Sequence, residues 1–167
     1  MAVTLDATVG GSVSNSYVTL LRANTLMEQL PHADEWFEDL AINKTQLLVH
    51  ASRLIDRGLV FQGEKVSSSQ ALEWPRTGVT HPLTGAAISP TSIPEFVEWA
   101  TVEWAFDLYL TPDPDRGMNA AFDILRTPSY HAEFRGSARK VLPQAVAELL
   151  LPYGSRTSSS MVRLIRA

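Results

Sequence analysis

The sequence predicts a mainly α-helical protein built as a single domain over residues 1–167. A length of 167 residues fits one domain and allows a real hydrophobic core. Apolar residues recur at helical spacing in several segments separated by proline and glycine. Cysteine is absent, which excludes disulfide frameworks, thiolate nucleophiles and Cys-type zinc sites. We also expect a long irregular loop, a small β-hairpin and extended N- and C-terminal arms.

Residues 1–18 are polar and contain glycine and serine, which is typical of an extended arm. Thr19 is a candidate cap for a first helix over about residues 20–30, and Pro31 ends that helix because it lacks an N–H donor. The apolar face of this helix consists of Leu20, Ala23, Met27 and Leu30.

A second helix is predicted from an N-cap at Asp39 to a stop at Gly58. Its apolar stripe recurs at helical spacing and consists of Leu47, Leu48, Ala51, Leu54 and Ile55. His50 lies beside this stripe, and its spacing to other residues indicates a histidine at the helix boundary rather than a ligand.

Helical periodicity disappears over residues 59–92, which predicts a long ordered loop with a short strand at Leu59–Phe61. The Trp74-Pro75-Arg76 sequence lies in the middle of this loop. We expect Trp74 to anchor the loop to the helical body and Pro75 to stiffen it. Arg76 would then be available for a carboxylate or for a neighbouring subunit.

A third helix is predicted from Ser92 or Ile93 to about Leu110, with Pro94 in its first turn. It is apolar on most sides, which indicates burial against several neighbours. Its aromatic residues favour core packing or a subunit interface over base stacking, because no Arg or Lys lies among them. These aromatic residues are Phe96, Trp99, Trp104 and Phe106.

The acidic residues of the third helix are Glu95, Glu98, Glu103 and Asp107. General acid–base chemistry needs a paired geometry that this spacing does not enforce. A solvated or inter-subunit face is the favoured interpretation, and the lining of a negatively charged channel is the alternative.

The remaining chain is predicted to contain a strand pair within residues 120–135 and a short helix from Pro143 to Leu151. The helical body therefore covers residues 19–152. Residues 153–167 form a docking tail, in which residues 155–160 are a flexible linker. The end of the tail is apolar and basic and consists of Met161, Val162, Arg163, Leu164, Ile165, Arg166 and Ala167.

Two roles are open for this tail. It either folds back on its own domain or docks on a partner by strand pairing or groove binding. At ~3.3 Å per residue, the chain after Gly154 could reach ~40 Å, which is enough to cross onto a neighbour. Partner docking is favoured if the protein assembles.

Catalytic and cofactor-binding signatures are missing from the sequence. It has no H-E-x-x-H motif, no phosphate-binding loop around Gly63-Glu64-Lys65 and no G-x-S-x-G elbow. Fourteen basic against eighteen acidic residues give a formal net charge of −4, which disfavours attraction of nucleic acid over the whole surface. No targeting signal or membrane span is recognisable. We therefore expect no enzyme activity, no metal and no cofactor.

Several motifs in order resemble the neck proteins of tailed phages, which are head-to-tail connector adaptors. The resemblance starts at Asn15-Ser16-Tyr17-Val18, continues through the first two helices and Leu72–Arg76, and reaches the Ile93-Pro94 start of the third helix. It covers about residues 10–110, and the end of the chain matches more loosely. Many of these proteins are described as DnaT-like single-stranded-DNA-binding proteins.

The resemblance implies a four-helix-type bundle that forms a ring, commonly of twelve copies, beneath the portal protein of the phage head. It implies contacts to the portal, to adjacent subunits and to a head-closure or tail-completion protein. Genomic DNA would pass through the ring without specific binding. The protein would then belong to the virion and be present in the host cytoplasm during assembly.

Residues 112–140 depart from the family pattern because they lack the charged strand pattern that such proteins show. The alternative function is a DnaT-like single-stranded-DNA-binding replication accessory protein. That alternative predicts a basic groove with exposed aromatic side chains. A small helical enzyme subunit or regulator is a third, more distant interpretation.

Overall fold

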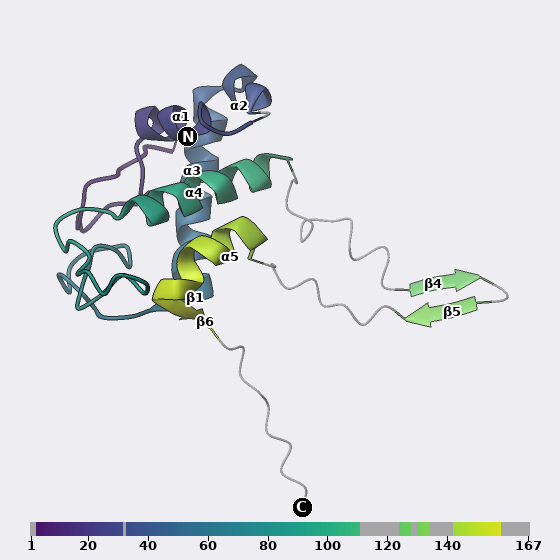
Figure 1. The fold of residues 1–167 in the computed structure, drawn as a ribbon. Coiled ribbons are helices and arrows are strands. Elements are labelled where there is room, and N and C mark those ends of the chain that lie inside the picture. The colour runs from purple at the N-terminus through teal and green to yellow at the C-terminus, as the bar shows by residue number, and fades with distance from the viewer. Residues whose placement is uncertain (1–2, 32, 111–123, 128–129, 134–141, 158–167) are drawn as a thin grey trace, which may run out of the picture.

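The computed structural model describes residues 3–31, 33–110, 124–127, 130–133 and 142–157 (Figure 1). In these ranges the helices are α1 (Leu20–Met27), α2 (Asp34–Glu38), α3 (Ala41–Gly58), α4 (Glu95–Leu110) and α5 (Gln144–Leu150), which continues into a 3₁₀ turn, η3 (Leu151–Tyr153). The strands are β1 (Leu59–Phe61), β2 (Glu64–Lys65), β3 (Arg76–Thr77), β4 (Ile124–Thr127), β5 (Tyr130–Glu133) and β6 (Gly154–Arg156).

The helices form the centre of the fold, and the strands form small antiparallel pairs, β1 with β6, β2 with β3 and β4 with β5. Helix α4 packs against α3 on one side and α5 on another, with α1 also in contact. The described part of the chain contains more helix than strand, so the prediction of a mainly helical protein is correct in this coarser sense. The predicted four-helix-type bundle is not clearly formed, because the helices differ greatly in length and the described residues also form small two-stranded sheets.

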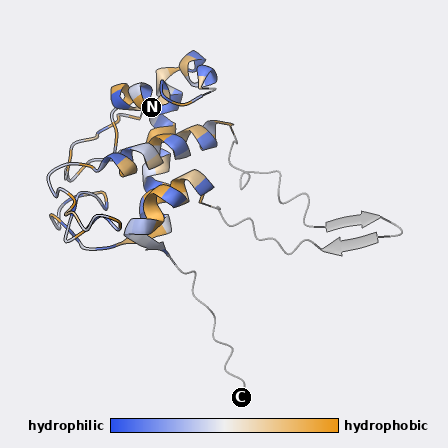
Figure 2. Cartoon of the chain, in the orientation of Figure 1, coloured by the Kyte–Doolittle hydropathy of each residue, from blue (hydrophilic) through white to orange (hydrophobic). Residues whose placement is uncertain are grey.

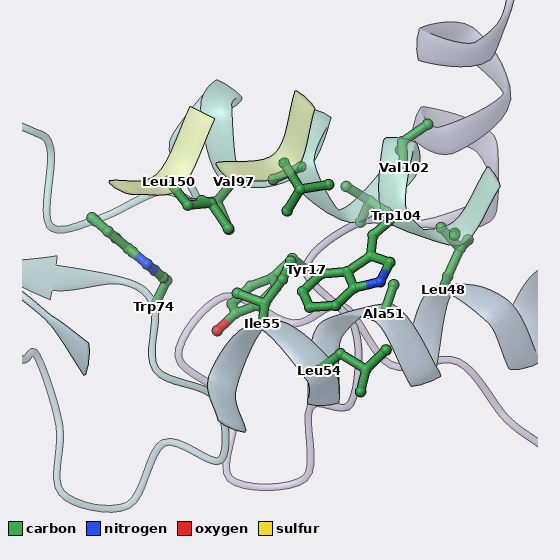
Figure 3. Close-up of a cluster of buried hydrophobic side chains, with 14 of the residues drawn as sticks. Tyr17, Leu48, Ala51, Leu54, Ile55, Trp74, Val97, Val102, Trp104 and Leu150 are labelled. Atoms are coloured by element: carbon green, nitrogen blue, oxygen red, sulfur yellow. The ribbon is translucent and has the colours of Figure 1, made fainter. Parts of the chain in front are cut away.

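The core lies where α3, α4 and α5 meet (Figure 3). The stripe predicted on the second helix is buried at Leu48, Ala51 and Ile55, each with 0% of its surface exposed. Helix α4 contributes Val97, Ala100 and Val102, also fully buried. Figure 2 shows hydrophobic and hydrophilic residues on both long helices. Packing of α4 against several neighbours explains why its apolar residues do not follow a single face.

The helix ends differ from prediction at several points. Thr19 is the N-cap of α1, and its hydroxyl accepts a hydrogen bond from the Arg22 N–H at 3.1 Å. Helix α1 ends at Met27, earlier than predicted. The N-cap of α3 is Leu40 rather than Asp39. The Asp39 carboxylate accepts hydrogen bonds from the Leu40 N–H and from the side-chain amide of Asn43. Helix α4 begins at Glu95, just after Pro94.

Helix α2 was not predicted. It is only five residues long, and its N-cap, Ala33, makes no side-chain hydrogen bond. Its buried residue is Trp36, whose indole N–H donates to the Asn24 side chain at 3.0 Å. The contact with α1, rather than a local signal, holds this turn in place.

The linker predicted at residues 155–160 is wrong for its first two residues. Ser155 and Arg156 belong to β6, which pairs with the predicted strand Leu59–Phe61. The Thr157 N–H then donates to the Gly58 carbonyl at 3.0 Å, so the ordered body extends past residue 152. The predicted strand pair within residues 120–135 is confirmed, because β4 and β5 pair antiparallel.

Candidate interaction site

Trp74 fixes the long loop to the helical body through a cluster of aromatic rings. Its side chain is 1% exposed, and its ring meets those of Phe61 and Phe96 edge-on, each at 5.4 Å between centroids. Phe96 in turn stacks on Tyr153 at 3.8 Å, with the planes 4° apart. The Trp74–Pro75 peptide bond is cis. This cluster joins the loop, α4 and η3.

Arg76 is buried and holds the loop from inside. Its guanidinium forms an ion pair with the Glu73 carboxylate at 2.7 Å and donates to the carbonyls of Gln62 and Gly63 at 2.8 and 2.7 Å. The carboxylate expected for Arg76 is therefore one of the same chain. Glu73 also binds Lys65 at 2.9 Å, so one carboxylate links β2 and β3.

A buried polar network ties the N-terminal arm to α3 and to the loop. The Tyr17 hydroxyl donates to the Asp56 carboxylate on α3. The Glu73 N–H donates to the Tyr17 hydroxyl at 3.1 Å and to Asp56 at 3.3 Å. Burial raises the pKa of Asp56 to about 6, partly offset by these donors, and raises the pKa of Tyr17 well above its usual value. The network joins three segments far apart in sequence.

Sequence reasoning missed both this network and Gln70. The Gln70 side chain is 4% exposed and donates to the carbonyls of Leu72 and Pro75 at 2.9 and 3.0 Å, while accepting from the Ser67 N–H. The Ala71 N–H also donates to the Gly11 carbonyl in the arm. No periodic pattern marks such residues, because their partners are backbone groups of an irregular loop.

An open groove lies beside the aromatic cluster, between the loop, the start of α4, α5 and η3. Its volume is about 570 Å³. Apolar and aromatic side chains dominate the lining, and Glu95 is the acidic residue in it. Phe96, Trp99 and Leu149 are partly exposed here. The lining residues are His81, Ala87, Ile88, Ser89, Pro94, Glu95, Phe96, Trp99, Leu149 and Tyr153.

The four acidic residues of α4 do not share one environment. Glu98 binds Arg22 of α1 at 2.8 Å, and Glu95, whose side chain is 72% exposed, lies 3.7 Å from the same guanidinium. Glu103 has a buried oxygen without a partner among the described residues. Its pKa is raised by burial and by the nearby Glu148. Burial also raises the pKa of Asp107.

Basic side chains of the described body are mostly engaged. Arg22, Lys65 and Arg76 form ion pairs with carboxylates. Lys44 is 7% exposed and lies over the rings of Trp36 and Phe37, at 5.8 Å from each. Within this part of the chain, the exposed basic residues that form no ion pair are Arg53, Arg57 and Arg156.

The predicted docking residues 161–166 lie outside the described residues. In the described part of the chain, no helix is long and apolar enough to cross a membrane. The same part holds no group of three His, Cys, Asp or Glu side chains that could bind a metal ion.

Comparison with known proteins gives one family match. The model of the family described as "Putative DnaT-like ssDNA binding protein" matches residues 1–167. No curated protein and no solved structure shows a significant similarity to the chain.

Proposed function

We propose that this chain, which belongs to the family described as "Putative DnaT-like ssDNA binding protein", acts through binding rather than catalysis. The proposed role is that of a structural head-to-tail connector of a tailed phage. In this proposal copies of the chain form a ring under the portal protein and present a platform to the head-closure or tail-completion protein. The order of motifs from Asn15 to Pro94, which resembles that of tailed-phage neck proteins, supports the proposal.

The charge distribution is the observation that carries the proposal. The body of residues 3–31, 33–110 and 142–157 contains seven basic and fourteen acidic residues, a net charge of −7. Its ion pairs occupy several of those basic side chains. A negatively charged surface repels the phosphate backbone of DNA. A ring through which DNA slides must avoid binding that backbone.

The groove and the loop network support the same proposal. Buried Trp74 and Arg76 make the loop a rigid part of the body, so that it can offer a fixed surface to a neighbour. The groove has aromatic walls and an acidic residue, which suits a protein side chain better than a nucleotide phosphate.

Electron microscopy of the purified protein mixed with its cognate portal protein tests the connector function. We expect rings on one face of the portal, even where the protein alone is monomeric. A variant with Arg163→Asp and Arg166→Asp should fail to attach while keeping the circular dichroism of the body. Failure of the wild-type protein to bind the portal at micromolar concentration would contradict the proposal.

Single-stranded DNA binding is the second candidate, and the family description by itself favours it. A charge observation also favours it, because the residues outside that body comprise seven basic and four acidic residues, a net charge of +3. The test is a titration of the protein with a fluorescent single-stranded oligonucleotide at several salt concentrations. Micromolar binding that weakens steeply with salt supports this function, and no binding at low salt rejects it.

A further inference from the structure

We propose that the groove beside Trp99 is the resting site of the chain's own segment Met161–Ala167 in the free protein. The inference does not depend on either proposed function, because it concerns the unbound chain.

The walls and the segment are complementary in polarity. Phe96, Trp99 and Leu149 give the groove a partly exposed apolar surface. The segment carries Met161, Leu164 and Ile165, which lie on one face at a spacing of i, i+3 and i+4 if that segment forms a helical turn. Amphipathic peptides bind hydrophobic grooves by placing apolar side chains with this spacing into them.

The charges are complementary as well. Lysine and arginine do not occur among the groove residues, whereas Glu95 lies in the lining with a side chain that is 72% exposed. Arg22 is held more closely by Glu98, at 2.8 Å, than by Glu95, at 3.7 Å. Glu95 can therefore accept an additional cation, and the segment supplies Arg163 and Arg166.

The geometry of the chain end places the segment within reach. Tyr153 is itself a groove residue and directly precedes β6. Thr157, the residue after β6, is fixed to the Arg57 and Gly58 carbonyls. Thr157 and Met161 are the same number of residues apart as Tyr153 and Thr157. Each of these two stretches of chain spans at most ~13 Å when fully extended. Ser158–Ser160 are small and polar, so the chain can turn back along β6 to the groove.

The test compares the full-length protein with a full-length Leu164→Asp, Ile165→Asp variant. Each is titrated with a fluorescent synthetic peptide of the natural sequence of residues 161–167. The variant should bind the peptide at least tenfold more tightly than the wild type, because its own segment no longer competes. Adding Leu149→Asp to the variant should abolish that gain, whereas adding Leu83→Asp, which changes a 90% exposed loop residue outside the groove, should preserve it.

Several results would overturn the inference. Equal peptide affinity for the wild type and the variant would show that the groove is open in the free protein. Persistence of binding with Leu149→Asp, in protein with unchanged circular dichroism, would place the peptide elsewhere. Light scattering adds a further arm, because a wild-type oligomer that dissociates in the Leu164→Asp, Ile165→Asp variant would mean that a second copy provides the segment.

Discussion

At the scale of single residues, the Asp56 carboxylate combines burial with an exchangeable proton. It accepts hydrogen bonds from the Tyr17 hydroxyl and the Glu73 N–H, yet burial outweighs these donors and raises its pKa to about 6 from the usual 3.8. A raised carboxyl pKa means that the folded protein binds the proton more tightly than the unfolded chain does. The contribution of Asp56 to stability therefore increases as pH falls from about 7 to about 4.

The first prediction concerns this pH dependence. Asp56→Asn should remove the rise in unfolding free energy that Asp56 produces between pH 7 and pH 4, which is at most roughly 3 kcal/mol for a shift of this size. Tyr17→Phe should move the rise to higher pH, because the Tyr17 hydrogen bond lowers the Asp56 pKa. Urea unfolding followed by circular dichroism at each pH measures both effects.

Glu64→Gln is the matched control, because Glu64 is an exposed carboxylate on the neighbouring strand β2. That variant should follow the wild-type pH profile. If Asp56→Asn also keeps the wild-type profile, the carboxylate is not the group that titrates, and the burial argument is wrong.

At the scale of elements, the pairing of β1 with β6 depends on the small size of Gly154. Its backbone is extended, with φ −168°, which any residue can adopt. A side chain would collide with the partner strand, since a Cβ at this position would lie 2.6 Å from the Val60 carbonyl oxygen and 3.1 Å from the Phe61 Cα. Glycine is needed here for close approach and not for an unusual conformation.

The second prediction follows from that close approach. Gly154→Ala should lower the unfolding free energy by about 1–3 kcal/mol, as overpacking does, and should speed hydrogen exchange at the Gln62 N–H, which donates to the Tyr153 carbonyl. Gly58→Ala is the control, because a Cβ at Gly58 meets nothing within 4 Å and Gly58 is the last residue of α3. Its effect should be neutral or slightly stabilising. Equal destabilisation by both changes would refute the packing argument.

The sequence predicts those elements that carry their own signals. The stripe from Leu47 to Ile55 predicts α3, and Pro94 predicts the start of α4, because local periodicity and proline geometry determine both. Strand β6, by contrast, has no local sequence signal. Ser155-Arg156 is typical of a linker, and these residues pair with Val60 and Leu59 only once the chain has folded. Helix α2 likewise depends on the contact of Trp36 with Asn24.

The residues of the candidate site also divide into those with a local sequence signal and those without one. The Trp74-Pro75 sequence marks the loop anchor, because a tryptophan in an irregular stretch has few alternatives to burial. The partners of Arg76 are carbonyls and a carboxylate brought together by β2 and β3, and no spacing in the sequence reveals them. No sequence pattern predicts the groove either, since the loop and α4, which provide some of its walls, are separate in the sequence from α5 and η3, which provide the others.

At the scale of the whole molecule, charge is divided between two parts of the chain. The described body has a net charge of −7, and the remaining residues have a net charge of +3, which together give the formal −4. Within the remaining residues, the stretch 134–141 contains Arg135, Arg139 and Lys140 and no acidic residue. If any part of this chain contacts a phosphate backbone, electrostatics favours these residues over the body.

The last prediction uses this division to locate any DNA contact. Replacing Arg135, Arg139 and Lys140 by glutamine should weaken binding of a single-stranded oligonucleotide. The slope of log affinity against log salt concentration should become less steep by about 0.7 for each phosphate that is no longer neutralised. Replacing Arg22 and Lys65 by glutamine also removes positive charge but should leave that slope unchanged, because both side chains are held by carboxylates. A slope that falls equally in the two variants would mean that net charge alone governs binding. Oligonucleotide binding that depends on Arg22 or Lys65 would instead place the nucleic acid on the body, against the charge argument for a connector.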